Sequence, residues 1–289
     1  FGGSGYLASL IKNSNNKKTN TYTFFSRRKN DRNYINFLSF KKNLNTFKNF
    51  DIIIHLIGPN QNLLKKDKKL IKQKNQITSN ICDLCLANNI KLIYLSSMQI
   101  YKDYGVDNIL VNSKLNLKSP YSKSHNDSEK IILKKFKNSK KNFIILRMGN
   151  VFGFNKIKNI RDIQSNLIHN LCFDALKKKN ILINNGYIQR TIIPSQIFLL
   201  IISSIINRNL FNNSIENVFY KNLSLKEIAY LIKKRLNLLF KFDTTVIIKK
   251  FNNKKKFKIY SKKYLNFKLS NKKIYVEIDQ VLKTIKKFT

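Results

Sequence analysis

Three short apolar runs in the first half of the chain restrict its fold more than any other feature. They cover residues 51–58, 91–97 and 142–147, and consist mostly of Ile, Leu, Tyr and Phe. Runs of this length without polar alternation are typical of strands buried on both faces. A helix is expected over residues 73–88, because apolar residues recur there at three- and four-residue spacing. The residues on that apolar face are Ile77, Ile81, Leu84 and Cys85.

The chain opens on a glycine-rich turn, in which Gly2, Gly5 and Ala8 fit the pattern G-x-x-G-x-x-G/A. In such a turn the first two glycines let the backbone approach a pyrophosphate, and the third small residue lets the next helix pack closely. The helix N-terminus adds unpaired N–H groups and the positive end of its dipole. The alternative is an ordinary strand-to-helix turn. The predicted cofactor contacts at this turn are Gly2, Gly5, Tyr6 and Leu7.

The residues beside this turn bear on the sheet and on the choice of cofactor. Such a turn normally follows a buried strand, so we expect the sequence to lack a strand of about five or six residues, with Phe1 as its last residue. Residues 21–25 are predicted to form the next strand, which leads to Arg27 and Arg28. An acidic residue there would bind the ribose of NAD, whereas an arginine accommodates the 2′-phosphate of NADP. The two arginines favour NADP over NAD.

Tyr121 lies at the start of a predicted helix and is the candidate acid/base. A tyrosine with a pKa of about 10 is a poor base at neutral pH, and a cation one helical turn further on would lower that pKa. At that position the chain has His125, whereas Lys123 falls on the opposite side of the helix. An imidazole can donate one hydrogen bond to a ribose hydroxyl. It would lower the tyrosine pKa only if protonated, which burial disfavours.

The carboxyl ends of the apolar runs carry further candidates, because ligands bind at that edge of an open parallel sheet. Ser97 ends the second run and offers a hydroxyl, with a loop-capping serine as the alternative interpretation. Gly58 ends the first run and would allow close backbone approach to a cofactor. His55 lies inside an apolar run and is interpreted as a buried core histidine rather than a catalyst.

These motifs, in this order, resemble those of the extended short-chain dehydrogenase/reductase superfamily, the nucleotide-sugar epimerases and dehydratases. The segments that carry the resemblance are the glycine turn, His55-Leu56-Ile57-Gly58-Pro59-Asn60, Ser97 with Ile100-Tyr101, Tyr121 with His125, and Leu146-Arg147 with Asn150-Val151-Phe152-Gly153. The resemblance implies an α/β fold, with a Rossmann-type doubly wound parallel sheet and a smaller C-terminal α/β substrate-binding lobe. It places the NAD(P)-binding domain over residues 1–150 and the partly interleaved lobe over residues 151–289.

The resemblance also implies roles for single residues. Tyr121 would be the acid/base, Ser97 would align the reacting hydroxyl, and His125 would contact the cofactor ribose in place of the family's lysine. Asn150 and Arg190 would contact a nucleotide-linked sugar, Arg190 through the diphosphate. The expected activity is NAD(P)-dependent epimerisation, dehydration or reduction of that sugar. The enzyme is expected in the cytoplasm, with a homodimer as a further expectation.

The net charge of +41, from 56 Lys and Arg against 15 Asp and Glu, allows two interpretations. A basic surface binds nucleic acid or anionic membranes through phosphate contacts. The basic residues are spread over the whole chain, however, in a composition rich in Lys, Asn and Ile, and a nucleic-acid footprint would cluster. Compositional drift is therefore favoured, and nucleic acid is not an expected partner. The alternative function is a catalytically impaired relative that binds a dinucleotide or RNA as a regulatory or scaffold protein.

Other residues are predicted to be structural. Cys82 and Cys85 lack a second ligand pair, so they are interpreted as small buried residues and no metal site is expected. The apolar run 192–206 is interrupted by polar residues and falls short of the roughly 20 residues that span a membrane. Glu129 and Arg147 are expected to be structural, Glu129 through a neighbouring cation.

Two features of the C-terminal third are also interpreted as structural. Ser224 and Glu227 fit a helix capping box, in which each residue bonds the backbone of the other. The lysine-rich residues 249–289 fit a solvated final subdomain or a phosphate-binding tail.

Overall fold

The computed structural model describes residues 1–14, 20–26, 33–37, 47–102, 109–139, 142–153, 166–250 and 270–288. Arg27 and Arg28, the predicted NADP contacts, lie outside these residues. The chain divides into two units. The first comprises Phe1–Lys102, Val111–Met148 and Ile202–Val218, and the second comprises Asp103–Leu110, Gly149–Ile201 and Phe219–Thr289. The assignment of the cofactor to one domain and the substrate to another stays a prediction.

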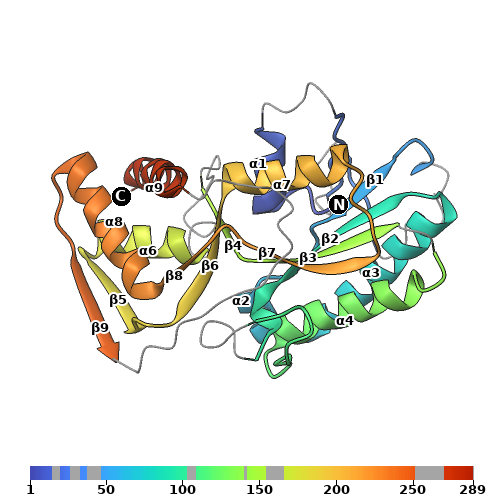
Figure 1. Cartoon of the computed structure of the whole chain (residues 1–289), viewed down its shortest axis with the longest axis horizontal. Helices are drawn as coiled ribbons and strands as arrows, with labels where there is room; N and C mark the ends of the chain where they lie inside the picture. The colour runs from blue at the N-terminus through green and yellow to red at the C-terminus, as the bar shows by residue number, and fades with distance from the viewer. Residues whose placement is uncertain are drawn as a thin grey trace. The chain divides into compact units, whose positions relative to one another are not determined.

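A four-stranded parallel sheet forms the centre of the first unit (Figure 1). Its strands, in spatial order, are β1 (Ile52–His55), β2 (Lys91–Ser97), β3 (Phe143–Met148) and β7 (Ser214–Val218). The first three correspond to the three apolar runs, and all residues of β3 and nearly all of β2 are buried. Parallel pairing places the carboxyl ends of these strands at one edge of the sheet, where ligands bind in folds of this kind.

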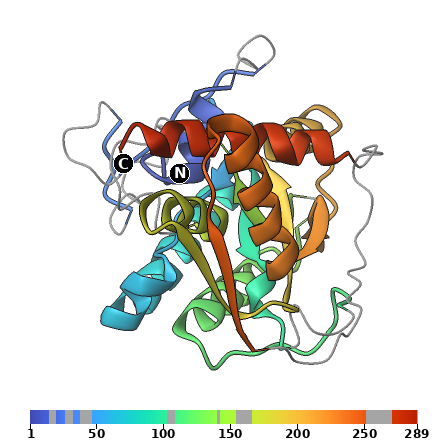
Figure 2. The ribbon, with the colours of Figure 1, turned by 90° about the vertical axis from the view of Figure 1, so that its left-hand side faces the viewer.

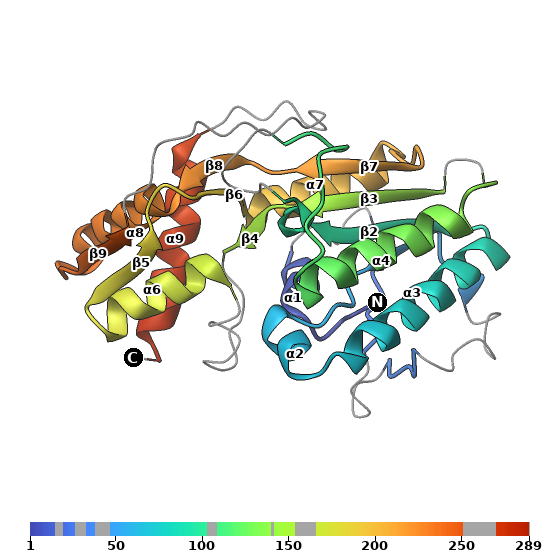
Figure 3. The same ribbon diagram turned by 90° about the horizontal axis from the view of Figure 1, so that it is seen from below.

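Helices cover both faces of this sheet, which makes it a doubly wound α/β fold as predicted. α3 (Lys69–Ala87) and α4 (Pro120–Lys135) run side by side on one face, and α1 (Tyr6–Lys12) lies on the other (Figures 1 and 3). The short α2 (Gln61–Lys66) precedes α3, and the 3-10 helix η3 (Met98–Ile100) follows β2 directly. The predicted apolar face of α3 is buried, through Ile77, Ile81, Leu84 and Cys85.

The predicted strand over residues 21–25 is wrong. These residues are extended, but they form no ladder with β1 or with another described strand. Their backbone is tied down at Phe25, whose carbonyl accepts hydrogen bonds from the N–H groups of Gly2 and Gly3. The side chains of Thr, Tyr and Phe favour extended backbone, yet a strand also needs a partner along its length to satisfy its N–H and C=O groups.

The second unit contains two smaller sheets. One consists of β4 (Asn150–Phe152), β6 (Gln189–Pro194) and β8 (Lys221–Ser224), and the other pairs β5 (Asn180–Asn185) with β9 (Thr245–Lys250). Only the β6–β8 pair of these ladders is antiparallel. Figure 2 shows the helices of this unit, which pack against one another and are α6 (Leu167–Lys177), α8 (Leu225–Phe240) and α9 (Asn271–Lys286). The unit is therefore a small α/β body of its own.

The lysine-rich C-terminal stretch ends in a helix with a buried side, whereas residues 251–269 lie outside the described residues, so the choice between a solvated subdomain and a phosphate-binding tail stays a prediction. α9 places lysines on one side and buries its apolar side, consisting of Ile274, Ile278, Val281, Leu282 and Ile285. The capping box at the start of α8 is confirmed, since Ser224 Oγ accepts from Glu227 N at 3.1 Å and Glu227 Oε2 accepts from Ser224 N at 2.6 Å. None of the helices within the described residues is both long and apolar enough to cross a membrane.

Candidate active site

Tyr121 and His125 lie one turn apart on the same side of α4. The helix starts after Ser119, whose Oγ accepts a hydrogen bond from Ser122 N at 3.0 Å. This cap sets the phase of the helix, so the rings of Tyr121 and His125 meet edge to face with their centroids 4.6 Å apart. Lys123 is exposed. The histidine, and not Lys123, therefore occupies the position from which a side chain can act on the tyrosine.

His125 is a neutral, nearly buried imidazole, 8% exposed. Its Nδ1 lies 3.1 Å from the hydroxyl of Tyr94 on β2. Burial lowers the pKa of His125 well below its usual range, and the positive charge of Lys74 and the neighbouring His55 lower it further. Among the described residues, the Nε2 atom has no hydrogen-bond partner. It is therefore available to a ligand beside Tyr121.

Lys74 of α3 reaches this site from a helix that carried no predicted functional residue. Its side chain is only 2% exposed, and its Nζ donates to Ser124 O on α4 at 3.2 Å. The ammonium also lies over the ring of Tyr94, 5.7 Å from the centroid. On another side it faces Gly58, where a Cβ would lie 3.9 Å from Nζ. Burial lowers the pKa of Lys74 to about 7, against the opposing effect of Glu129 and Asp127.

The sequence alone indicates that Lys74 occupies an unusual position. It lies three residues before Ile77 and seven before Ile81, so it falls on the apolar face that α3 turns to the core. A lysine at such a position is seldom fully buried without a specific partner. The conflict between a charged residue type and an apolar helix face therefore marks Lys74 as unusual.

Ser97 and His55 are both held by local hydrogen bonds. Ser97 Oγ accepts from Gln99 N at 3.2 Å and caps η3, which packs against α4. That is the alternative interpretation of this serine, and its role toward a substrate stays a prediction. His55 is fully buried, as predicted: its Nδ1 accepts from Ile57 N, so its Nε2 carries the proton and donates to Thr78 Oγ1 at 3.1 Å.

A buried ion pair joins the strand ends to α4. Arg147 on β3 donates from Nε to Glu129 Oε1 at 3.0 Å and from Nη2 to Glu129 Oε2 at 2.6 Å. Ser96 donates to the same carboxylate, and Arg147 Nη1 donates to the hydroxyl of Tyr101 at 2.7 Å. Tyr101 in turn donates to Asn217 on β7. The structural roles predicted for Glu129 and Arg147 are confirmed, and the network links three strands to the helix that carries Tyr121.

The glycine turn has a backbone that fits a dinucleotide. Gly2 has a φ of +91°, and a Cβ there would lie 3.0 Å from Leu56 C, so no larger residue fits. Gly5 N donates to Gly2 O at 3.0 Å, and no side chain caps α1, which begins directly after Gly5. The predicted contacts Tyr6 and Leu7 stand in the first turn of this helix. An anion such as a pyrophosphate is what such a helix start binds.

The predicted substrate contacts lie in the second unit. Asn150 donates from Nδ2 to Thr191 O at 3.0 Å, which joins β4 to β6. Arg190, on β6, donates from Nη1 to Gln189 O at 2.9 Å and is half-buried. Both residues thus have backbone partners within their own unit. Their roles toward a substrate stay predictions.

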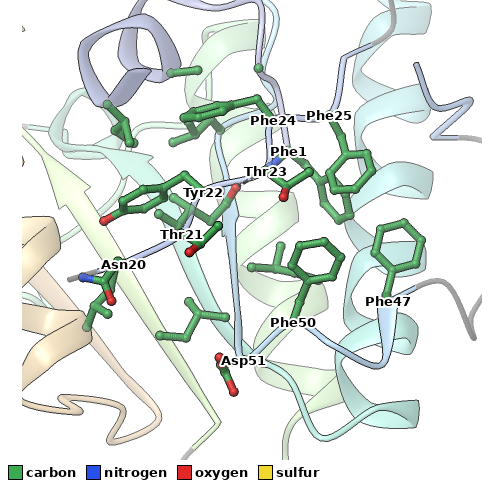
Figure 4. Close-up of a pocket in the computed structure, with 18 of the residues that line it drawn as sticks. Phe1, Asn20, Thr21, Tyr22, Thr23, Phe24, Phe25, Phe47, Phe50 and Asp51 are labelled. Carbon is green, nitrogen blue, oxygen red and sulfur yellow. Dashed lines mark hydrogen bonds between the residues drawn. The ribbon is translucent and has the colours of Figure 1, made fainter. Parts of the chain in front are cut away.

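A cavity of about 360 Å³ lies between residues 20–25 and the edge of β1 that does not face β2 (Figure 4). Its lining combines polar residues such as Thr21, Thr23 and Asp51 with the aromatic rings of Phe1, Tyr22, Phe24, Phe25, Phe47 and Phe50. None of the predicted catalytic residues lines it. We therefore place the candidate active site at the strand ends, where ligands bind in parallel sheets, and not in this cavity. The described residues include no group of three or more His, Cys, Asp or Glu that could hold a metal ion.

Residues 1–193 match the model of a family described as NAD dependent epimerase/dehydratase. A comparison with curated proteins finds no match.

Solved structures of low sequence identity share the fold over most of the chain. UDP-N-acetylglucosamine 4-epimerase from Bacillus cereus is 17% identical with a TM-score of 0.72, covering 99% of this chain and 97% of its own. dTDP-glucose 4,6-dehydratase from Bacillus anthracis, in complex with NAD, is 15% identical with a TM-score of 0.73, covering 99% and 95%. RMD from Pseudomonas aeruginosa, complexed with NADPH, is 13% identical with a TM-score of 0.65, covering 83% and 81%.

Proposed function

The chain belongs to the NAD dependent epimerase/dehydratase family, and on that premise we propose that it epimerises, dehydrates or reduces a nucleotide-linked sugar with NAD or NADP. The observation that carries the proposal is the pair of Tyr121 and His125 on α4, beside the carboxyl end of β2. A hydroxyl that can exchange a proton stands there next to an imidazole nitrogen with no partner among the described residues. This is the arrangement that hydride exchange at a sugar carbon needs from the protein.

The fit of a dinucleotide rests on the turn at Gly2 and Gly5. The close approach of Gly2 to Leu56 and the helix start without a side-chain cap suit a pyrophosphate, which is drawn to the positive end of the helix dipole. When bound, the nicotinamide would accept or donate the hydride. The turn and the family leave NAD and NADP as alternatives, and the neighbours include structures with each.

The protein's own part in the reaction is to move and hold protons. Tyr121 takes the proton from the sugar hydroxyl as the carbon is oxidised and returns it on reduction. In the tautomer that this function requires, the Tyr94 hydroxyl donates to His125 Nδ1, and the imidazole proton on Nε2 is donated to a ribose hydroxyl. Ser97 positions the sugar hydroxyl. Asn150 and Arg190 hold the sugar and the diphosphate, for which the planar guanidinium of Arg190 is suited.

Replacing Tyr121 with Phe tests the acid/base assignment. The change removes one hydroxyl and keeps the ring beside His125, so we expect turnover to fall by at least about 10³-fold with cofactor affinity preserved. UDP-N-acetylglucosamine and dTDP-glucose, named for the similar enzymes, are the first substrates to assay, with products identified by NMR. Tyr230→Phe, at an exposed tyrosine, is the matched control. Unchanged turnover in Tyr121→Phe would remove Tyr121 from its role.

The catalytically impaired alternative makes a different prediction for the unaltered protein. It expects RNA to bind with affinity that falls steeply with salt, since a net charge of +41 favours phosphate contacts. Titrations with NAD(H), NADP(H) and a short RNA separate the two functions. Binding of RNA alone would contradict the enzyme.

A further inference from the structure

The site around Tyr121 lacks an evident source of positive charge. A tyrosine acts as a base near neutral pH only if a nearby cation stabilises its phenolate. His125 does not serve, because burial keeps its imidazole neutral by lowering its pKa well below the usual range. Lys123 is exposed on the other side of α4. Under the function proposed above, the charge must come from another element.

Within the described part of the first unit, Arg147 and Lys74 are both buried against this helix, and Arg147 is already paired with Glu129. Lys74 Nζ donates to Ser124 O, on the residue directly before His125, and lies over the ring of Tyr94, the hydrogen-bond partner of His125. An ammonium has three N–H donors. Among the described residues Ser124 O accepts one of them, so two remain for a ligand.

Glu129 and Asp127 act on Lys74 through space, but no carboxylate of the described residues forms an ion pair with it. Glu129 is a source of negative charge on α4, but both of its oxygens are engaged by Arg147, and Oε1 also by Ser96. Asp127 accepts from Asn75 instead. A buried charge without a partner is costly, and such residues are concentrated at functional sites.

The free side of the ammonium faces the carboxyl end of β1. Gly58 lies there, and its missing side chain leaves room: the nearest atoms to a Cβ at Gly58 are Lys74 Cε at 3.8 Å and Nζ at 3.9 Å. Because ligands of a parallel sheet bind at this edge, the two remaining donors point to the predicted place of the cofactor.

We propose that Lys74 is a cofactor-binding residue, which donates to a hydroxyl of the ribose attached to the nicotinamide and supplies the site's positive charge. His125 can still donate a hydrogen bond from α4, but as a neutral imidazole it does not supply the positive charge, which Lys74 supplies from α3. This inference rests on the proposed function. It adds a residue from a helix that the sequence motifs do not include.

The inference predicts how cofactor binding depends on pH. The titratable groups that face Lys74 are Glu129, Asp127 and His125 on α4, Tyr94 on β2 and His55 on β1. Both histidines have pKa values far below 6.5 and Tyr94 has one well above 10, so none of these three titrates between about pH 6.5 and 9. Lys74, with a pKa of about 7, loses its proton in this range. Cofactor affinity should therefore fall as pH rises, by at most about tenfold per pH unit.

Lys74→Met and its exposed neighbour Lys72→Met form a matched pair on α3 for the test. The measurement is the dissociation constant of NADH and of NADPH, read by fluorescence from pH 6 to 9. We expect Lys74→Met to bind at least about tenfold more weakly at pH 6.5 and to lose the pH dependence, while Lys72→Met matches the unaltered protein. Lys74→Arg, which stays charged, should keep its affinity at pH 9.

A direct titration of Lys74 in the unaltered protein tests the proposal even if the variants unfold. In protein labelled with ¹³C-lysine, the Lys74 pKa should rise when NADH is added, because the hydrogen bond favours the charged form. A Lys74 pKa unaffected by NADH, or a Lys74→Met variant that binds like the unaltered protein, overturns the inference alone. If the unaltered protein binds neither NADH nor NADPH, the proposed function falls as well.

Discussion

At the scale of single residues, Arg147 supports the interior of the first unit. Its guanidinium meets Glu129 in a bidentate pair and reaches Tyr101, so three motifs from separate parts of the sequence converge on one side chain. The side chains of the pair are 5% and 3% exposed. Charges removed from water in this way are stable only while both partners are present.

Arg147→Met should therefore destabilise the fold strongly, since it leaves the Glu129 carboxylate buried without its partner. We expect a loss of about 3–5 kcal/mol in the free energy of unfolding, measured by urea denaturation. Arg147→Met with Glu129→Leu should recover part of that loss. Lys135→Met breaks the more exposed pair with Asp83 and should cost at most about 1 kcal/mol. Equal losses in the two single variants would contradict this account.

Because the chain's histidines are buried, we expect the free energy of unfolding to fall in acid. Burial lowers the pKa of His55 and His125 well below the usual range and that of His169 to about 4, and these are the three histidines of the chain. Below about pH 6.5 the unfolded chain binds protons that the folded chain does not, so stability falls as pH falls. Each histidine adds up to about 1.4 kcal/mol per pH unit. Urea denaturation between pH 4.5 and 7 measures the slope.

His169→Gln isolates one of these contributions. The backbone N–H of Gly153 donates to His169 Nε2 at 3.3 Å, and a glutamine oxygen can accept in its place. The variant should show a shallower decline of stability from pH 6.5 to 4.5 than the unaltered protein. Parallel curves would show that His169 takes no part in the acid dependence.

At the scale of elements, a residue of α9 caps the N-terminus of α7 (Ser195–Asn207). The buried Glu277 of α9 accepts from Ser195 Oγ at 2.6 Å and from Gln196 N at 3.1 Å. A carboxylate at this point satisfies a backbone N–H of the first helical turn and faces the positive end of the helix dipole. A side chain 81 residues away from Gln196 thus serves as a cap.

Replacing Glu277 with Gln should weaken this cap without changing its shape. Both hydrogen bonds are accepted by Glu277 Oε1, so a glutamine oxygen can keep them, and the lost charge at the helix start should cost about 1–2 kcal/mol in the free energy of unfolding. Lys283→Gln, at an exposed position of α9, should change stability by less than about 0.5 kcal/mol. Thermal melts of the unaltered protein and of the two variants at pH 7 measure both changes in stability. A Glu277→Gln melting temperature equal to that of the unaltered protein would show that the cap contributes nothing.

At the scale of the whole molecule, the net charge of +41 opposes folding through repulsion among like charges. Salt screens that repulsion, since the Debye length falls from about 30 Å at 0.01 M to about 3 Å at 1 M. We therefore expect the melting temperature to rise between 0.02 and 0.5 M NaCl. A fall would mean that the ion pairs of the fold outweigh the repulsion.

The sequence by itself determined three strands of the parallel sheet, the buried face of α3 and the order of the motifs. The runs that became β1, β2 and β3 and the apolar face of α3 could be read from residues close together, because periodicity and turn residues act locally. The juxtaposition of Tyr121 with His125 is local in the same sense, since one helical turn fixes it.

Only the tertiary structure decided which residues from different elements meet. Lys74 reaches Ser124 across 50 positions of sequence, and Tyr101 reaches Asn217 across 116. Residues 21–25 failed as a strand for the same reason, because strand formation depends on a partner elsewhere in the chain. The Tyr–His pair follows from local helical geometry, whereas the charge proposed to serve it comes from a second helix that packing alone brings near.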